Sequence, residues 1–263
     1  MSFTDPPLSR MRGCVRQPEV RNDDERRQPL PVFRSRESRR YGEPVVDRQL
    51  LSSIEFFKGF DTASFEAVVA ASQSRDFSRG GVLFTENDAA TELFVVVSGR
   101  IAIANRSVDG RESVIALMER GDLFGEMPLF DNRARSAEAR SLEDSEVIAI
   151  PYAPLRSIYE SSPVLLWNVV EMLAVRLRST DEHLADSVFL DVTGRTAKRL
   201  LELSGDHDEF SLPITQEELA GMVGASRERV NKAIASFVKL GWIEQSDRRY
   251  RITNRDQLAL RAS

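Results

Sequence analysis

Between Ile214 and Leu240 the apolar positions recur with the period of an α-helix, in two short runs separated by a glycine. The first run has an apolar stripe at i, i+3 and i+4 spacing, formed by Leu219, Met222 and Val223. In the second run the apolar residues again share one helical face: Val230, Ala233, Ile234 and Phe237. This pattern predicts two helices joined by a tight turn, the sequence form of a helix-turn-helix.

Polar residues mark where these two helices begin and end. Thr215 and Glu218 have the spacing of a capping box, which predicts that the first helix begins near Gln216. Gly224 stands where that helix must stop and adopt a positive φ. Ser226 is a good N-cap for the second helix.

The outer face of the second helix carries only small and polar groups, namely Arg227, Glu228, Asn231, Lys232 and Ala235. A recognition helix needs this arrangement, because its first residues enter the major groove while its rear packs on the domain. An arginine can bond guanine, and a carboxylate can accept from cytosine. The alternative is a solvated helix in which Glu228 and Lys232 form an i, i+4 pair.

The part of the chain after Leu50 has a different pattern. Two helical segments are expected first, at Leu50–Phe57 and Thr62–Ala71. Short β-rich runs follow at Val82–Thr85, Glu92–Val97, Arg100–Ala104, Ser113–Met118 and Glu146–Ile150. Turns that contain glycine or asparagine separate them, and Asp109-Gly110 is one such turn. Short strands with regular turn signals predict a compact β-roll or barrel.

One motif in this roll has the chemistry of a nucleotide site. It runs from Phe124 to Phe130 as FGEMPLF and is followed by Arg135-Ser136-Ala137. Arg135 can hold phosphate oxygens, a nearby hydroxyl can add a bond, and Glu126 can accept from a sugar hydroxyl. An internal Glu126–Arg135 ion pair without any ligand is the alternative.

A long amphipathic helix is expected to begin at Ser161-Ser162-Pro163, where proline suits the first helical turn. Its apolar seam alternates at +4 and +3 spacing through Leu166, Val170, Leu173, Leu177, Thr180, Leu184 and Ser187. This heptad spacing favours pairing of two helices, and hence a symmetric homodimer. A lone helix packed on its own domain is the alternative.

Composition narrows the class of protein. With 263 residues and 41% hydrophobic content, the chain can form two domains. We expect a cytoplasmic protein without membrane association, since no apolar run approaches a membrane span. One cysteine, Cys14, with His183 and His207 argues against a metal, haem or iron–sulfur site. No constellation of residues indicates an enzyme.

Charge is unevenly distributed along the chain, whose net value is −5. The second helix of the helix-turn-helix is locally basic, and local charge governs contact with phosphate. Residues 1–43 contain ten arginines, five prolines and few periodic apolar positions, which predicts a disordered tail. That tail either adds non-specific DNA affinity or has no dedicated role, and Cys14 within it is interpreted as an incidental thiol.

From about Val46 to the C-terminus the chain resembles the Crp–Fnr superfamily of bacterial transcription regulators. The resemblance rests on FGE with RSA in the roll, on FLDVTGR at residues 189–195, and on VGASRE at residues 223–228. It implies an α+β fold: a cyclic-nucleotide-binding β-roll at residues 44–160, a dimerisation helix and hinge at 161–190, and a winged helix-turn-helix at 191–263. The roll is a double-stranded β-helix, or jelly roll.

The resemblance also implies which residues bind the ligand. Glu126 would bond the ribose 2′-hydroxyl, and Arg135 and Ser136 would hold the cyclic phosphate of cyclic AMP. Thr180 would touch adenine, and its neighbour Asp181, a serine in the best-known pattern, would reach the adenine of the other subunit. The full implied ligand set is Gly125, Glu126, Met127, Arg135, Ser136, Ala137, Thr180 and Asp181. Phe189, Leu190 and Asp191 fall at the hinge, and Asp191 is expected to cap the next helix.

In the reading head, which is the helix-turn-helix expected to contact DNA, Arg227 and Glu228 match the family's base-contacting pair. Position 232 is usually arginine and is Lys232 here, which keeps a donor but loses the bidentate fork. The wing is expected at Ile243–Ile252, with Arg248 and Arg249 touching phosphate. The implied DNA-binding set is Ser226, Arg227, Glu228, Arg229, Asn231, Lys232, Arg248 and Arg249.

These expectations describe a homodimeric transcription regulator that binds a palindromic TGTGA-like site under allosteric control by cyclic AMP. Its implied partners are double-stranded DNA, a second copy of the chain, cyclic AMP and RNA polymerase. Two alternatives stay open at this point. One is a ligand-independent regulator of the same fold, which Asp181 supports, and the other is a cyclic-nucleotide-binding module of an enzyme or channel.

Overall fold

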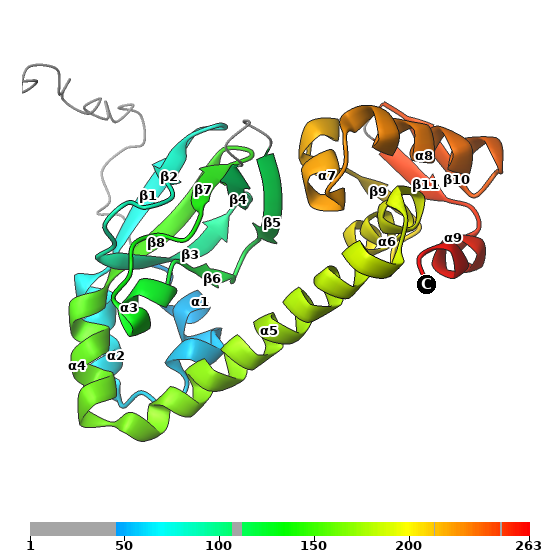
Figure 1. Ribbon diagram of the computed structural model, residues 1–263. Coiled ribbons are helices and arrows are strands. Elements are labelled where there is room, and N and C mark those ends of the chain that lie inside the picture. The colour runs from blue at the N-terminus through cyan, green and yellow to red at the C-terminus, as the bar shows by residue number, and fades with distance from the viewer. Residues whose placement is uncertain (1–45, 107–111, 213, 248) are drawn as a thin grey trace, which may run out of the picture. The chain divides into compact units, whose positions relative to one another are not determined.

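The computed structural model describes residues 46–106, 112–212, 214–247 and 249–263 (Figure 1). The predicted tail with Cys14, the Asp109-Gly110 turn and Arg248 lie outside these residues. Within the described ranges, no helix is long and apolar enough to cross a membrane.

The first folded part is a roll of two antiparallel sheets, as the short strands predicted. One sheet has the order β1-β8-β3-β6 and the other β2-β7-β4-β5. The strands of the first sheet are β1 (Gln73–Phe77), β3 (Glu92–Ser98), β6 (Leu123–Phe124) and β8 (Ser145–Pro151), and those of the second are β2 (Val82–Phe84), β4 (Ile101–Arg106), β5 (Glu112–Met118) and β7 (Glu138–Ser141). The stacked rings of Phe94 and Phe124, 5.4 Å apart, lie in the core of the roll.

Short helices complete the roll: α1 (Arg48–Ser53), η1 (Glu55–Phe57), α2 (Thr62–Ala71), α3 (Met127–Asp131) and α4 (Tyr152–Ser161). Phe56 and Tyr159 join η1 to α4, with ring centroids 5.7 Å apart and nearly perpendicular planes. The apolar faces of these helices pack against β3 and β8. The residues buried there form a second hydrophobic core, separate from the core between the two sheets.

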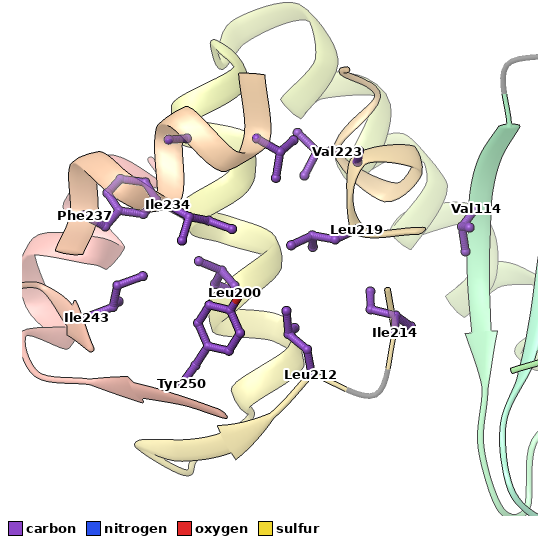
Figure 2. Packing of buried hydrophobic residues seen from close by; sticks show 14 of the residues in the cluster. Val114, Leu200, Leu212, Ile214, Leu219, Val223, Ile234, Phe237, Ile243 and Tyr250 are labelled. Carbon is purple, nitrogen blue, oxygen red and sulfur yellow. The ribbon is translucent and has the colours of Figure 1, made fainter. Parts of the chain in front are cut away.

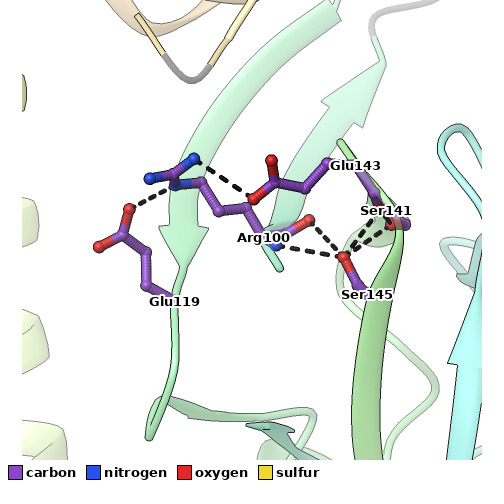
Figure 3. A network of polar contacts seen from close by, with 5 residues as sticks. All are labelled: Arg100, Glu119, Ser141, Glu143 and Ser145. Atoms are coloured by element: carbon purple, nitrogen blue, oxygen red, sulfur yellow. Dashed lines mark hydrogen bonds and ion pairs between the residues drawn. The ribbon is translucent and has the colours of Figure 1, made fainter. Parts of the chain in front are cut away.

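A polar network fixes one end of the roll (Figure 3). Arg100, between β3 and β4, bonds Glu119 at 2.7 Å and Glu143 at 3.3 Å. Its backbone N–H donates to the Ser145 hydroxyl at 3.1 Å, and Ser141 donates to the same hydroxyl at 2.9 Å. The start of β4 is thereby held to the turn between β7 and β8.

The long helix, α5 (Leu166–Phe189), begins later than predicted. Ser161 ends α4, and Pro163 opens a single 3-10 turn, η2 (Pro163–Leu165), before α5 starts. Pro163 does occupy a helical first turn, as predicted, but that turn belongs to η2. Val169 is 3% exposed and packs on the core beneath α1 and α4, which anchors the first part of α5 to the roll.

The C-terminal part is a winged helix-turn-helix. Its helices are α6 (Val192–Ser204), α7 (Gln216–Val223), α8 (Arg227–Lys239) and α9 (Arg255–Arg261), and its sheet has the order β10-β11-β9, from β9 (Glu209–Ser211), β10 (Ile243–Ser246) and β11 (Arg249–Ile252). Leu200, Leu219, Ile234 and Phe237 point into one apolar core with Tyr250 (Figure 2). The predicted first and second helices and the wing are therefore confirmed in position.

Candidate nucleotide site and nucleic-acid interface

The backbone at the start of α3 makes the first part of the nucleotide site. Gly125 has φ +75°, and a Cβ atom built there would lie 2.6 Å from Nη1 of Arg135. Only glycine therefore lets the arginine approach this turn. Glu126 follows at the N-cap of α3 and is 2% exposed, so a charged side chain is held almost entirely within the roll.

Arg135 is the second part of the site and is 5% exposed. Nη1 donates to the carbonyl oxygen of Gly125 at 2.9 Å and to the Tyr152 hydroxyl at 3.2 Å, while Nη2 donates to the carbonyl oxygen of Glu92 at 2.7 Å. The guanidinium also stacks over Phe84, 4.1 Å from the ring centroid. These contacts hold the fork rigidly, in a low-dielectric setting where charge-assisted bonds are strong.

Burial has opposite effects on the two polar groups here. It lowers the pKa of Arg135 from its ordinary value and raises the pKa of Tyr152 to about 12, against the opposing influence of the adjacent guanidinium. Nε of Arg135 is buried without a hydrogen-bond partner in the described part of the chain. A buried donor of this kind is costly unless something accepts from it, which fits an anionic group bound beside the arginine.

Glu126 bonds a different arginine from the one that the sequence suggested. Nη1 of Arg176, on α5, lies 2.6 Å from Oε1 of Glu126, and Nη2 donates to the carbonyl oxygen of Leu123. The ligand-free alternative of a Glu126–Arg135 pair is therefore wrong, because Arg135 faces carbonyl groups and a phenol. Arg176 was missed by sequence reasoning; its one signal is its position one turn before Thr180 on the same helix.

The other predicted ligand residues differ in how exposed they are. Ser136 is exposed, Met127 is 48% exposed and Ala137 is buried at 4%. The Thr180 hydroxyl donates to the carbonyl oxygen of Arg176 at 2.9 Å, which places it on the α5 turn that contacts Glu126. Asp181 is exposed. The roll and α5 thus bring together Gly125, Glu126, Arg135 and Arg176, with Thr180 at the margin.

The first helix of the helix-turn-helix is capped as predicted. The Thr215 hydroxyl accepts from the N–H of Glu218 at 3.2 Å, and the Glu218 carboxylate accepts from the N–H of Thr215 at 2.6 Å. Gly224 ends α7 in the left-handed region with φ +66°. Ser226 then caps α8 by accepting from the N–H of Arg229 at 3.4 Å.

Helix α8 separates its faces as the sequence pattern required. The buried side consists of Val230, Ala233, Ile234 and Phe237. The exposed side carries every predicted reading residue, namely Ser226, Arg227, Glu228, Arg229, Asn231 and Lys232. An exposed polar face beginning at the helix N-terminus is the geometry of a helix that enters a major groove.

The wing is a hairpin of β10 and β11. Arg249 pairs in register with Ser246 and is exposed beside the turn. Arg251, two residues further along β11, forms ion pairs with Glu209 at 2.6 Å and with Glu244 at 3.4 Å. Sequence reasoning assigned nothing to residues 204–212, whereas they include β9, which pairs with β11 and supports the wing.

At the predicted hinge, Asp191 caps α6 as expected by accepting from the N–H of Gly194 at 2.8 Å. The bond to Gly194 and the contact with Arg261 lower the pKa of Asp191. Leu190 precedes the cap in extended backbone, and Phe189, the last residue of α5, is 82% exposed.

The predicted seam of α5 lies on an open face, with one exception. The exposed seam leucines and valine are Val170, Leu173, Leu177 and Leu184, at 37–64% exposure. Leu166, also in the predicted seam, is partly buried and packs against the core of its own roll. Exposed apolar residues in a row at heptad spacing are typical of a helix that pairs with another.

Comparison with known proteins agrees with this architecture. The cyclic nucleotide-binding domain matches residues 74–162, and the Crp-like helix-turn-helix domain matches residues 194–261. A "CRP-like cAMP-activated global transcriptional regulator" of Mycobacterium tuberculosis is 36% identical over 221 residues, covering 81% of this chain and 99% of that protein. The chain belongs to the Crp/Fnr family. The relatives that it resembles, including Vfr of Pseudomonas aeruginosa at 32% identity over 68% of this chain and 88% of that protein, are named as transcriptional regulators.

Two solved structures share the fold. The c-di-GMP responsive global regulator CLP of Xanthomonas campestris is 27% identical with a TM-score of 0.64, over 73% of this chain and 99% of that one. FixK2 of Bradyrhizobium japonicum has a TM-score of 0.67 at 20% identity, over 73% of this chain and 98% of that one. Together, the two family models and the relative from Mycobacterium tuberculosis show that the chain is a DNA-binding transcription regulator with a cyclic-nucleotide-binding domain.

Proposed function

We propose that this regulator binds cyclic AMP in the roll, acts as a homodimer and recognises a palindromic TGTGA-like operator when the nucleotide is bound. The observation that carries the ligand proposal is the unpaired Nε of Arg135 beside a glycine turn and a buried glutamate. A cyclic phosphate supplies the missing acceptor, and a ribose hydroxyl is the donor that Glu126 lacks from the roll itself. The relative from Mycobacterium tuberculosis is named as cAMP-activated, which favours this nucleotide.

Arg176 provides the physical link from this site to the dimer. Its guanidinium bonds Glu126 and belongs to the helix that also carries the apolar seam. A nucleotide that bonds Glu126 competes with or adds to this contact, and so changes how α5 is held. Thr180 and Asp181, one turn further along α5, would contact the adenine of the same subunit and of the partner.

Dimerisation through α5 would place two reading heads at the separation of successive major grooves. Arg227 and Glu228 would contact bases, and Lys232 would contact the base that an arginine usually reads in this family. Ser226, Arg229, Asn231 and Arg249, with Arg248 outside the described residues, would contact phosphate or flanking bases. RNA polymerase is the proposed protein partner on such a promoter.

Calorimetry with the wild-type protein tests the ligand proposal. We expect binding of cyclic AMP at micromolar concentration, and no binding by Arg135→Leu, because the buried cation that donates to the phosphate is removed. Arg133→Leu is the matched control, since Arg133 is an exposed arginine in the same loop and should leave binding unchanged. Retention of a circular dichroism spectrum and of the dimer shows that Arg135→Leu still folds.

Three outcomes contradict the proposal. Absence of cyclic AMP binding at millimolar concentration favours the ligand-independent regulator of the same fold. Tighter binding of cyclic GMP or of cyclic di-GMP, tested in parallel, assigns the site to another cyclic nucleotide. A monomeric mass in sedimentation, unaffected by Leu177→Glu in the seam, contradicts the dimer.

A further inference from the structure

The carboxylate of Asp191 does more than cap α6. It also bonds the guanidinium of Arg261, the last residue of α9, through both of its oxygens. The Asp191 side chain is 63% exposed and that of Arg261 is 33% exposed, so the pair lies at the surface of the hinge. One side chain therefore joins the first turn of α6 to the end of the C-terminal helix.

The sequence makes room for this contact at Gly194. A Cβ atom at that position would lie 3.0 Å from Nη1 of Arg261 and 3.1 Å from its backbone oxygen. Any larger residue would thus press on Arg261, while Leu258, fully buried, fixes α9 to the domain core. The end of α9 is consequently held at a defined place against the start of α6.

A second arginine continues this connection to the reading head. Nη1 of Arg195 donates to the carbonyl oxygen of Leu190 at 2.7 Å, immediately before Asp191. Its Nε donates to the carbonyl oxygen of Val223 at 2.8 Å, the last residue of α7. The hinge backbone and the turn of the helix-turn-helix therefore share one guanidinium.

We infer that Arg261 is a positioning residue for operator recognition: by clamping Asp191 it makes the start of α6 a fixed pivot for the reading head. The inference rests on the proposed function, because it concerns how a change at the hinge reaches α7 and α8. With the clamp, movement of the chain at Leu190 turns α6, α7 and α8 together. Without the clamp, the first turn of α6 can shift relative to α9, and only part of the movement at Leu190 reaches α7 and α8.

This role differs from a contribution to stability. An exposed ion pair changes an equilibrium constant only by a factor of about two to five. Loss of the pair should therefore leave the domain folded. What it should alter is the coupling between ligand and operator, and the preference of the dimer for one separation of half-sites, since both depend on a defined pivot.

The test compares Arg261→Gln with Arg261→Lys and with Arg255→Gln. Arg255 is also on α9, but it bonds Asp208 at 3.2 Å and the carbonyl oxygen of His207 at 2.9 Å, so its loss weakens α9 without touching Asp191. Operator affinity is measured by fluorescence anisotropy with and without cyclic AMP. It is measured on a palindrome of natural spacing and on one whose half-sites are two base pairs further apart.

We expect Arg261→Gln to reduce the cyclic AMP effect on operator affinity about threefold and to weaken the preference for natural spacing by a similar factor. Arg261→Lys, which keeps the charge, should restore most of both quantities, and Arg255→Gln should change neither. Equal behaviour of Arg261→Gln and wild type, or equal losses in Arg261→Gln and Arg255→Gln, overturns the inference alone. If cyclic AMP does not change the operator affinity of the wild type, ligand control is refuted. The spacing preference of Arg261→Gln relative to wild type then still tests the positioning role of Arg261.

Discussion

The nucleotide site in the roll and the reading face of α8 use arginines in opposite ways. Arg135 is buried, stacked on an aromatic ring and bonded to carbonyl oxygens, so its position is fixed before any ligand arrives. Arg227 is exposed at the first turn of α8. The groups of the first site are pre-organised, whereas the second has exposed side chains on a packed helix, which are free to adapt to base edges.

This difference predicts that changes at the nucleotide site alter both folding and binding, whereas changes on α8 alter binding alone. The largest effect is expected at Arg176. Arg176→Met leaves the Glu126 carboxylate buried without its cation, which should lower the free energy of unfolding by about 2 kcal/mol, given that Arg176 is itself partly exposed. Urea denaturation measures this.

The double variant Glu126→Gln with Arg176→Met is the sharper form of that experiment. It removes the uncompensated charge, so we expect it to recover most of the lost stability while nucleotide binding stays weak. Arg178→Met, an exposed arginine on the same helix, is the control and should be neutral. Equal stability of Arg176→Met and Arg178→Met would show that the pair with Glu126 contributes nothing.

The next largest effect concerns the reading face. Arg227→Ala should weaken operator binding by about 1.5 kcal/mol, because a bidentate base contact is lost, and should relax specificity at one position of each half-site. The thermal midpoint should not change, since Arg227 is exposed. Lys239→Ala removes an equal charge from the last turn of the same helix and should have a much smaller effect on affinity.

A smaller change is expected where this chain departs from its family. Lys232→Arg restores a guanidinium fork, and should improve discrimination at one base pair of the half-site by about 1 kcal/mol. Binding-site selection with both proteins measures this. Identical selected sequences would mean that Lys232 contacts phosphate and not a base.

The smallest predicted effect is a pH dependence next to the hinge. Burial, and then the charge of Arg199, whose Nη1 lies 2.8 Å from Nε2, lower the pKa of His183 below its ordinary 6.5. The folded protein therefore binds this proton less well than the unfolded chain. The resulting stability is present above pH 6.5 and is lost as pH falls through the lowered pKa. His183→Gln should flatten this part of the stability profile, measured by thermal unfolding between pH 7.5 and 5.

The sequence predicted local features better than contacts between distant segments. The capping box at Thr215, the glycine stop at Gly224 and the division of α8 into two faces follow from spacing within a few residues, and all are confirmed. The Asp191 cap is confirmed for the same reason. Helices α3 and α4 and strands β1, β6 and β7 were not predicted, because their patterns are short and their burial depends on other strands.

The buried site shows the same limit more clearly. Glu126 and Arg135 lie close in sequence, and their opposite charges suggested a pair. The carboxylate instead meets Arg176, 50 residues away on α5, while the nearby arginine is turned toward carbonyl oxygens. Arg261 at the hinge is 70 residues from Asp191. Charge spacing cannot reveal such pairs, because they are set by where a later helix packs.

The central claim is that a cyclic nucleotide in the roll controls operator binding. It is tested most directly by the affinity of the wild-type protein for a TGTGA palindrome, measured by fluorescence anisotropy at one fixed salt concentration with and without saturating cyclic AMP. We expect an increase of about 5- to 150-fold, the usual range for coupled sites. An unchanged affinity, in a protein that calorimetry shows to bind the nucleotide, would contradict it.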